Sequence, residues 1–520
     1  MRLIPRLLEL QKSHGHLTDD LLRQVAREAN VPLYRVQGLV SFYPHFRTTP
    51  PPKTEIAVCR DMACWLKEPC AAKRVRDHFS NESEVEIRES SCLGRCDIAP
   101  AALVNEHPQT IDAACGVTGA AMPETTARQW RCNPYATEAE RYGLLRELLA
   151  GRGSDASDRL IATLKDSGLR GMGGAGFPTA AKWEFVRKET RTPKYLICNA
   201  DESEPGTFKD REILASLSHL VIEGMILGAL AVGATTAILF IRHEYEPERI
   251  AFQNELSRVR NSGLLQQAGV DIEVFVSPGG YILGEETALL ECLEDKRGEP
   301  RNKPPFPGSH GLHGQPTLIN NVETLAMVPA IIRHGADWWK AQGMPGFAGL
   351  KLMSVSGDIA RPGVYEIPVG TTVQELIEQA GGIPDGKPLL AFLPGGASSN
   401  FLPAGAADTP LDFAAMSKAG SMLGSGALFI VAQGTDLLAL ATNIVRFFRN
   451  ESCGKCVPCR VGSQKAVDLL DGIQTGEKPR VTLDLLPDLG ETLTQTSICG
   501  LGQVALNPVL SVMKNWPELK

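Results

Sequence analysis

Eight of the thirteen cysteines fall into two quartets whose spacing suits metal binding. The second quartet contains a C-x2-C-x2-C run, which supplies three corners of a cubane iron–sulfur cluster, and a distant fourth cysteine completes it. The first quartet has C-x4-C followed by C-x3-C, unlike the paired C-x2-C arms of a zinc ribbon. Four thiolates also suit tetrahedral zinc, so zinc remains the alternative, above all at the first quartet. The quartets are Cys59, Cys64, Cys92 and Cys96, and Cys453, Cys456, Cys459 and Cys499.

Five other cysteines stand alone in the sequence and are predicted to be buried or partly buried free thiols. Thiolate ligands survive in a reducing compartment. Thirteen cysteines without a recognisable signal peptide therefore predict a cytoplasmic protein. The isolated cysteines are Cys70, Cys115, Cys132, Cys198 and Cys292.

The length of 520 residues predicts roughly three to four domains. The formal net charge of −7 and the lack of long basic runs exclude nucleic acid as the principal partner. One apolar stretch, 220–241, is long enough to cross a bilayer and carries only one charge, Glu223. Gly233 interrupts it, and residues 235–241 have the composition of a strand. We therefore expect a buried helix followed by a buried strand, and no membrane span.

The expected elements change character along the chain. Leucines at helical spacing predict helices in the first fifty residues, and Thr18 is placed to cap the second helix. Strand-like segments at 55–58 and 85–87, with helical residues between them, lead to the two cysteine pairs of the first quartet. Helices and strands alternate over 142–336, as in an α/β fold. The following region is β-rich to about 433, and the remainder is helical.

A glycine-rich segment contains a formal G-x-G-x-x-G at Gly171, Gly173 and Gly176. The usual dinucleotide fingerprint follows a hydrophobic strand, whereas residues 158–167 are predicted to form a helix that ends at Gly168. We therefore reject the standard Rossmann interpretation. Glycines still let backbone amides approach a phosphate or a ring edge closely, and a following helix adds its positive end. A glycine-rich turn without a ligand is the alternative.

Acidic and amide side chains collect in three further loops of the central region. A short apolar strand at 195–198 opens into the acidic loop 199–206, and loops at strand ends often carry chemistry. The turn 284–287 adds two carboxylates, and residues 317–324 add paired asparagines. Such groups hydrogen-bond flavin nitrogens, ribityl hydroxyls and sugars. A solvated surface or a cation site is the plainer alternative.

These motifs together resemble the NADH-binding flavoprotein subunit of respiratory complex I, and roughly the first 120 residues resemble its thioredoxin-like 2Fe-2S partner subunit. Such a fusion is also met in the diaphorase subunits of NAD-dependent formate dehydrogenases and of some hydrogenases. The resemblance implies a 2Fe-2S cluster at the first quartet and a 4Fe-4S cluster at the second. The segments that carry it are 92–100, 168–183, 199–210, 284–287, 303–307, 319–325 and 451–462 with Cys499.

Carried over position by position, the resemblance implies binding sites for FMN and NAD(H), with the chemistry carried by FMN and no catalytic side chain. Met172 stands where the family commonly has arginine, which weakens phosphate binding only if that side chain, rather than the backbone, makes the contact. The implied FMN residues are Gly171, Gly173, Lys182, Asn199, Asp201, Glu202, Tyr281, Gly284, Glu285, Asn320, Asn321 and Thr324. The implied NAD(H) residues are Phe177, Phe185 and Phe306 on the adenine side, with Glu204, Glu286 and Lys303.

The implied fold class is an α/β multidomain chain whose flavin domain is Rossmann-like without the usual fingerprint. The expected segments are a helical bundle (1–52), a thioredoxin-like 2Fe-2S ferredoxin domain (53–122), a polar linker (123–141), an α/β FMN- and NAD-binding domain (142–336), a β-grasp module of soluble-ligand-binding type (337–433) and a C-terminal helical bundle with the 4Fe-4S cluster (434–520).

The implied function is that of a diaphorase subunit, which exchanges hydride between NAD(H) and FMN and passes single electrons to or from iron–sulfur clusters. Its first expected partner is the catalytic alpha subunit of a molybdenum- or tungsten-containing formate dehydrogenase, with iron–sulfur clusters of its own. A NAD-linked hydrogenase or a complex I variant is the alternative within this class. A zinc-stabilised scaffold or ligand-binding protein is the alternative from a different class, and it predicts a colourless protein.

Overall fold

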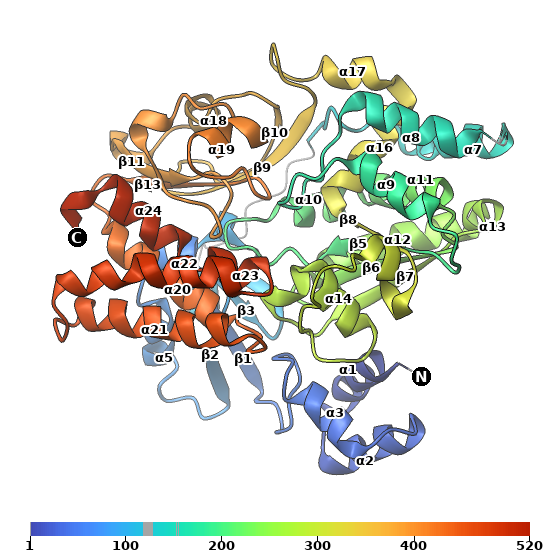
Figure 1. The fold of residues 1–520 in the computed structure, drawn as a ribbon. Helices are drawn as coiled ribbons and strands as arrows, with labels where there is room; N and C mark the ends of the chain where they lie inside the picture. The colour runs from blue at the N-terminus through green and yellow to red at the C-terminus, as the bar shows by residue number, and fades with distance from the viewer. Residues whose placement is uncertain (1, 118–127, 152, 154, 520) are drawn as a thin grey trace.

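The computed structural model describes residues 2–117, 128–151, 153 and 155–519. Three sheets lie in this part of the chain, with strand orders β2-β1-β3-β4, β7-β6-β5-β8 and β10-β9-β13-β11-β12. Figure 1 shows the N-terminal helices below the central sheet, and the third sheet and the C-terminal helices beside it. The α/β multidomain expectation is confirmed.

The N-terminal helices are α1 (Leu3–His14), α2 (Asp19–Glu28) and α3 (Leu33–Val40). The predicted cap is present, because the Thr18 hydroxyl accepts a hydrogen bond from the Leu21 amide at 3.3 Å. Asp295, far along the chain, accepts the amides of Leu3 and Ile4 at 2.7 and 2.8 Å. A carboxylate at the N-terminus of a helix satisfies free amides and complements the helix dipole. Asp295 thereby fixes α1 to the central region.

The first sheet joins the parallel pair β1 (Thr54–Cys59) and β2 (Val85–Ser90) to the antiparallel strands β3 (Ala101–Val104) and β4 (His107–Thr110). Helices α4 (Met62–Lys67), α5 (Ala71–His78) and α6 (Ile111–Ala114) accompany it. The two predicted strands are confirmed. Among the isolated cysteines, Cys132, Cys198 and Cys292 are buried and Cys115 is half-buried. The prediction is wrong for Cys70, which is exposed just before α5.

Part of the predicted linker, 123–127, lies outside the described residues. The part that follows packs against the central region, because Trp130, Cys132 and Tyr135 are buried. The Tyr135 hydroxyl donates to the Glu223 carboxylate at 2.8 Å, and the Leu145 amide donates to the same carboxylate at 3.1 Å. Residues 128–141 are therefore anchored by apolar side chains and by one buried carboxylate.

The buried carboxyl of Glu223 is expected to make the stability of the fold depend on pH. Burial raises the pKa of its carboxyl from 4.5 to about 7. Between these values the unfolded chain has released the proton while the folded chain holds it, so stability falls as the pH rises from 4.5 to 7. Glu223→Gln keeps both hydrogen bonds and removes this loss. We expect the difference in free energy of unfolding between the variant and the parent to be about 3 kcal/mol more favourable to the variant at pH 8 than at pH 5.

The measurement for Glu223→Gln is thermal unfolding of both proteins across this pH range. Glu147→Gln, at an exposed position of the neighbouring helix α7 (Gly143–Ala150), is the control and should follow the parent. Identical pH profiles for Glu223→Gln and the parent would contradict the expected cost of ionising Glu223.

The central sheet is entirely parallel, and its strands are β5 (Tyr195–Ala200), β6 (Thr236–Arg242), β7 (Asp271–Ser277) and β8 (Thr317–Asn321). The first strand in the chain, β5, lies between β6 and β8, so the connections leave it in opposite directions. Such a switch point opens a crevice at the carboxyl ends of the strands. The covering helices include α8 (Ala156–Ser167), α9 (Thr179–Lys188), α10 (Lys209–Ser216), α11 (Ser218–Val232), α12 (Glu246–Asn261), α14 (Glu286–Leu293) and α16 (Val322–His334).

The apolar stretch at 220–241 forms a helix and a strand, as predicted. Helix α11 ends at Gly233, which has a φ of +80°, and β6 follows at Thr236. Every residue of α11 except Leu230 is buried. No single helix among the described residues is long and apolar enough to cross a membrane, while α10 and α11, bent by 95°, meet the length and composition criteria only as a pair.

The third sheet is mixed, with strands β9 (Leu350–Gly357), β10 (Gly363–Pro368), β11 (Leu389–Leu393), β12 (Leu402–Pro403) and β13 (Ala427–Ala432). Helix α18 (Val373–Gln379) begins with a capping box between Thr372 and Glu375 and packs its apolar side into a core shared with this sheet. Helix α19 (Phe413–Lys418) follows β12. A helix packed on a mixed sheet agrees with the predicted β-grasp module.

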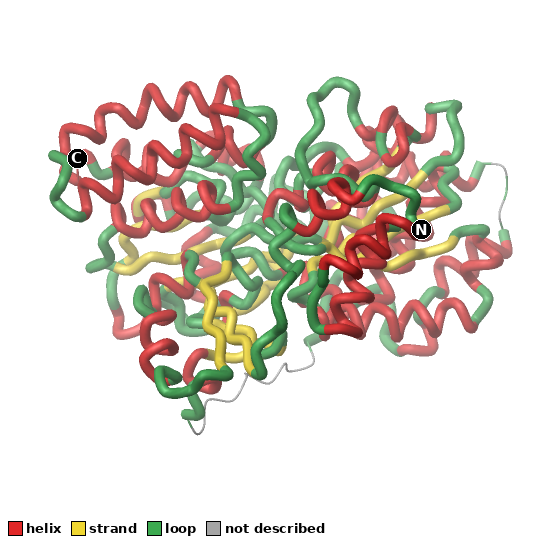
Figure 2. The backbone as a smooth tube through the Cα atoms, turned by 90° about the horizontal axis from the view of Figure 1, so that it is seen from below, coloured by secondary structure: helices red, strands yellow, loops and turns green. Residues whose placement is uncertain are grey.

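The C-terminal region is helical, as predicted, and Figure 2 shows its helices gathered beside the third sheet. Helix α20 buries Phe447 and Phe448, and both rings pack against Tyr281 of the central region. The helices are α20 (Leu437–Asn450), α21 (Val457–Gln474), α22 (Leu486–Thr496), α23 (Gly500–Val504) and α24 (Asn507–Asn515).

Candidate flavin and iron–sulfur sites

The first cysteine quartet lies at the end of the first sheet, and all four thiols are buried. The sulfurs of Cys92 and Cys96 are 3.8 Å apart. Backbone amides of Gly94 and Ala101 donate to the sulfurs of Cys92 and Cys64 at 3.4 and 3.3 Å. Hydrogen bonds from Cys59 and Cys96 lower the pKa of Cys92 well below its usual range. Convergent sulfurs with amide donors are what a thiolate-bound cluster requires.

The second quartet surrounds the starts of two helices. Cys456 directly precedes α21, Cys459 lies in the first turn of α21, and Cys499 directly precedes α23. Burial raises the pKa of the Cys499 thiol, and the nearby backbone amides of Leu501 and Gly502 oppose that shift.

Gly502 brings Cys499 close to the rest of the second quartet, because a Cβ at this position would lie 2.9 Å from the Cβ of Cys459. Burial raises the pKa of Cys459 to about 11, and coordination to iron would favour the thiolate form of this side chain. The donors fit an iron–sulfur group. Among the described residues, no group of three or more His, Cys, Asp or Glu side chains is arranged to hold a single metal ion.

A cavity of about 380 Å³ opens at the carboxyl ends of β5 and β8, between the glycine-rich loop and the third sheet. Eight of the twelve predicted FMN residues line it, together with Glu204 from the NAD(H) set. The eight are Gly173, Asn199, Asp201, Glu202, Tyr281, Gly284, Glu285 and Asn321. The structure therefore brings most of the predicted flavin residues to one crevice.

The glycine-rich loop follows α8, which ends at Gly168 as predicted. A Cβ on Gly173 would lie 2.9 Å from the Cβ of Asn321, so only glycine allows this approach. The Met172 amide donates to the Thr324 hydroxyl at 2.9 Å. The Met172 side chain is buried and does not line the cavity. The Met172 side chain therefore does not take the place at the cavity of the arginine that the resemblance expects.

The other four predicted FMN residues hold the loop and the neighbouring strand. The Gly171 amide donates to the Phe177 carbonyl at 2.8 Å. The Lys182 ammonium donates to the Ile319 carbonyl at 3.1 Å, and the Asn320 amide oxygen accepts from the Trp183 indole at 2.9 Å. Thr324 accepts from the loop, as described above. These four do not line the cavity and contact the segments that do.

Asp201 and Glu202 are adjacent carboxylates with different surroundings. One oxygen of Asp201 accepts from the Ser203 hydroxyl, and the other is buried without a hydrogen-bond partner of standard geometry among the described residues. Glu202 accepts the amides of Asp210 and Arg211 at 2.8 and 3.0 Å. Burial raises the pKa of Asp201 to about 6 and that of Glu202 to about 7.

These surroundings assign the two carboxylates different tasks. Glu202 caps α10 and positions the loop, whereas Asp201 retains an oxygen for a polar ligand. An unsatisfied oxygen in the wall and a close glycine approach together fit the polar edge and ribityl chain of FMN.

Of the predicted NAD(H) residues, Glu204 lines the cavity and Lys303 pairs with Glu285 of its lining. The side chains of Phe177, Phe185 and Phe306 are 47%, 67% and 60% exposed, so these rings are not part of the core. They come from neighbouring elements, because α15 (Pro307–His310), which follows Phe306, packs against α9. Exposed rings gain by stacking on a planar base.

Lys303 organises the carboxylates beside these rings. Its ammonium donates to Glu285 at 2.9 Å and to Glu286 at 3.3 Å. Glu286 also pairs with Lys182 at 3.6 Å. The two carboxylates of the turn 284–287 are therefore paired with two lysine ammonium groups from outside the turn.

Sequence reasoning missed the contribution of the third sheet and of α23 to the cavity. The missed residues are Gly395, Ser398, Met422, Gly424, Ser425, Gly500, Leu501 and Val504. A glycine- and serine-rich composition at 395–399 and 424–426 was the available signal. Glu451 was also missed: its carboxylate accepts the Tyr281 amide at 2.8 Å and the Ser91 hydroxyl, joining the flavin site to the loop that holds Cys92.

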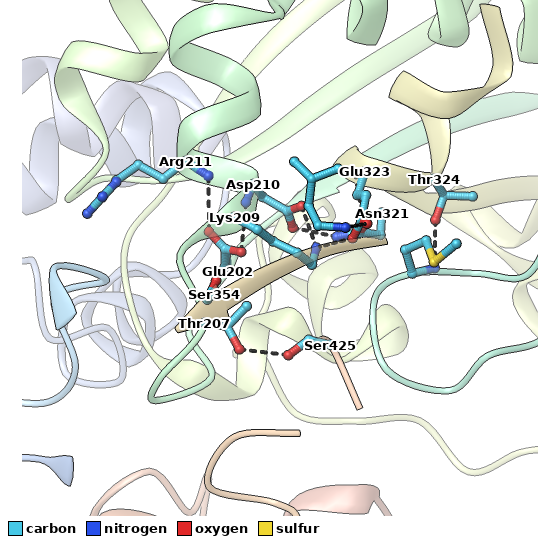
Figure 3. A network of polar contacts seen from close by, with 12 residues as sticks. Glu202, Thr207, Lys209, Asp210, Arg211, Asn321, Glu323, Thr324, Ser354 and Ser425 are labelled. Atoms are coloured by element: carbon cyan, nitrogen blue, oxygen red, sulfur yellow. Dashed lines mark hydrogen bonds and ion pairs between the residues drawn. The ribbon is translucent and has the colours of Figure 1, made fainter. Parts of the chain in front are cut away.

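Beneath the cavity lies a buried ionic network, part of which is drawn in Figure 3. Lys209 contacts Asp210 at 2.6 Å and Glu323 at 3.0 Å. Lys351, on β9, contacts the same Glu323 oxygen at 2.5 Å. Asp210 also accepts the side-chain amide of Asn321, which lines the cavity. The network connects the flavin wall to the third sheet.

Comparison with known proteins agrees with this geometry. An NADH-quinone oxidoreductase F subunit of Rhizobium meliloti (strain 1021) is 42% identical over 384 residues, which are 72% of this chain and 91% of the relative. The chain belongs to the F-subunit family of NADH-quinone oxidoreductase. The F subunit of Escherichia coli (strain K12) is 39% identical over 413 residues, covering 76% of this chain and 92% of the relative.

Four domain families match successive parts of the chain. They are "Thioredoxin-like [2Fe-2S] ferredoxin" at 1–114, "Nuo51 FMN-binding domain" at 164–330, "SLBB domain" at 352–400 and "NADH-ubiquinone oxidoreductase-F iron-sulfur binding region" at 439–519. The predicted resemblance and the predicted cofactors, FMN with one 2Fe-2S and one 4Fe-4S cluster, are confirmed. Zinc is therefore set aside for both quartets.

Solved structures match this chain over its full length. The crystal structure of NAD+-reducing [NiFe]-hydrogenase in the H2-reduced state has a TM-score of 0.89 and 33% sequence identity, and covers 100% of this chain and 92% of the matched chain. The crystal structure of the same hydrogenase in the air-oxidized state has a TM-score of 0.84 and 34% sequence identity, and covers 99% of this chain and 92% of the matched chain. The fused arrangement of domains therefore has a solved counterpart.

Proposed function

We propose that the chain is a diaphorase subunit that exchanges hydride with NAD(H) and passes single electrons to or from its iron–sulfur clusters. The observation that carries this proposal is one cavity lined by eight of the predicted flavin residues and by Glu204, with Cys499 of the second quartet directly before two lining residues. Bound FMN supplies the conversion between two-electron and one-electron transfer. Membership of the F-subunit family and the similarity to a NAD+-reducing hydrogenase support NAD(H) as the substrate.

The described residues would bind and orient rather than transfer protons. Asp201, Asn199 and the glycine-rich loop would hold FMN, with the other predicted FMN residues supporting them. Phe177, Phe185 and Phe306 would stack on the adenine side of NAD(H). Glu204, Glu286 and Lys303 would supply polar contacts. We assign no acid–base catalyst.

Both quartets adjoin segments that line the cavity, which supports a role for each in electron transfer. Cys499 directly precedes Gly500 and Leu501, and both residues line the cavity. Cys92 and burial raise the pKa of the Cys96 thiol, and the amide of Gly206, at the end of the acidic loop, opposes that shift. A second cavity of about 420 Å³ has Cys92 and Cys453 in its wall. We therefore place the second quartet on the path from the flavin and the first quartet beside it.

The test is anaerobic titration of the purified chain with NADH. We expect a coloured protein whose flavin and iron–sulfur absorption bleaches at stoichiometric NADH, and a parallel titration with NADPH measures nucleotide preference. A colourless protein, or a coloured protein that neither nucleotide bleaches, would overturn the proposal.

We propose the alpha subunit of a cytoplasmic, molybdenum- or tungsten-containing formate dehydrogenase as the partner. Thiolate clusters favour a reducing compartment. A [NiFe]-hydrogenase is the second candidate, and full-length similarity to a NAD+-reducing hydrogenase favours it. Co-purification from the native host decides between them: molybdenum or tungsten with formate-dependent NAD+ reduction supports the first, and nickel with H2-dependent reduction supports the second.

A further inference from the structure

The SLBB loop, defined here as residues 395–399, touches the carboxylate expected to contact NAD(H). The Ser398 amide donates to one oxygen of Glu204 at 2.6 Å. The Tyr281 hydroxyl donates to the other oxygen at 2.6 Å. Charge-assisted hydrogen bonds to both oxygens fix the direction of a carboxylate. Glu204 is therefore held from two sides, by the third sheet and by the flavin site.

The SLBB loop also packs directly against the backbone of the acidic loop. Gly396 has a φ of +80°, and a Cβ there would lie 2.9 Å from both the Cγ of Glu204 and the Pro205 carbonyl oxygen. The Ala397 amide donates to the same Pro205 carbonyl at 3.3 Å. Glycine at 396 thus serves two purposes, the left-handed backbone and the close approach to Glu204.

Contacts within the loop, with the third sheet and with α24 hold the SLBB loop in place. The Gly396 amide donates to the Ala427 carbonyl at 3.0 Å, and the Gly395 amide donates to the Ser399 hydroxyl at 3.2 Å. The Asn507 side-chain amide donates to the Ser398 carbonyl at 3.1 Å. A rigid support can hold Glu204 in one orientation before a ligand arrives, which lowers the ordering cost of binding.

We propose that the SLBB loop is a positioning element of the nucleotide site, and that it sets Glu204 for contact with the nicotinamide half of NAD(H). This inference rests on the proposed function. It gives the third sheet a part in nucleotide binding in addition to its place in the cavity wall. The loop acts through Glu204 and makes no contact with the reacting atoms.

Gly396→Ala tests the proposal, because the new methyl group meets Glu204 and Pro205. We expect the dissociation constant for NAD+, measured by calorimetry, and the KM for NADH with a ferricyanide acceptor each to rise about tenfold, which corresponds to about 1.4 kcal/mol. The kcat and the FMN content should stay close to those of the parent, because the three atoms nearest to the added Cβ belong to Glu204 and Pro205 and not to a predicted FMN residue.

Gly420→Ala is the matched control within the same module. Gly420 has a φ of +86°, and nothing lies within 4 Å of a Cβ built there. Both variants therefore carry the left-handed strain, and only Gly396→Ala adds the contact with Glu204. We expect similar melting temperatures for the two variants and parental nucleotide affinity for Gly420→Ala.

A double-mutant cycle separates positioning from general damage. With Glu204→Ala already present, Gly396→Ala should raise the dissociation constant less than about threefold, because the residue it displaces is gone. Equal affinities for Gly396→Ala and Gly420→Ala, full additivity in the cycle, or loss of FMN from Gly396→Ala would each overturn the inference. Failure of the parent chain to bind NAD(H) would instead overturn the proposed function.

Discussion

Gly173→Ala is expected to release the flavin from the purified chain. A Cβ at this position would lie 2.9 Å from the Cβ and 3.4 Å from the Cγ of Asn321. Asn321 is held in turn by Asp210 and caps α16 through the Glu323 amide at 3.0 Å, so it cannot give way easily. The glycine-rich loop must move instead, and this loop is the wall of the cavity. Overpacking of this kind typically costs about 1–3 kcal/mol.

The measurement is the ratio of flavin to protein after desalting, with the dissociation constant obtained from quenching of flavin fluorescence on rebinding. We expect at least about tenfold weaker binding, the equivalent of the lower part of that energy range. Gly405→Ala is the control, because nothing lies within 4 Å of a Cβ there and its backbone is not left-handed. Parental flavin affinity in Gly173→Ala would contradict the role given to the loop.

Local sequence signals predicted the parts of the site that short segments determine. The helix that ends at Gly168, the strand at 195–198 and the break at Gly233 all follow from periodicity and glycine placement within a few residues. The cysteine quartets are local for the same reason, because a cluster imposes its spacing on a short loop. These features needed no knowledge of the tertiary structure.

Long-range packing determined the parts that sequence reasoning did not reach. Glu202 and Asp201 are neighbours with the same chemistry, yet Glu202 turns to the amides that begin α10 while Asp201 keeps a free oxygen. Tyr245, which lies between β6 and α12, donates its hydroxyl to the Glu202 carboxylate at 3.1 Å. The sequence of residues 199–206 does not show which of the two carboxylates will be hydrogen-bonded by the start of α10 and which will keep an oxygen free.

The domain organisation also depends on long-range packing that the local sequence does not reveal. The polar composition of 128–141 favoured a linker, whereas its few aromatic residues bury themselves against the central region. The third sheet has its own apolar core, and its serines and glycines reach the flavin cavity only because β9 docks beside α10. The segment boundaries given from sequence therefore remain predictions.

Lys351→Met is expected to destabilise the fold more than any surface change in the same module. The buried network contains two ammonium groups, Lys209 and Lys351, and two carboxylates, Asp210 and Glu323. All four side chains are buried, so their charges balance away from water. Removal of Lys351 leaves one negative charge without compensation, and breaking a buried pair in this way costs about 3–5 kcal/mol.

Restoring the balance should restore much of the stability. In Lys351→Met/Glu323→Gln the remaining Lys209 and Asp210 compensate each other. The side-chain oxygen of the introduced glutamine can still accept the Leu352 amide, which Glu323 accepts at 2.8 Å. We expect the double variant to unfold at a higher temperature than Lys351→Met. Lys418→Met, on the exposed side of α19, should lie within about 0.5 kcal/mol of the parent. A double variant less stable than Lys351→Met would show that shape, rather than charge balance, holds β9 against the flavin domain.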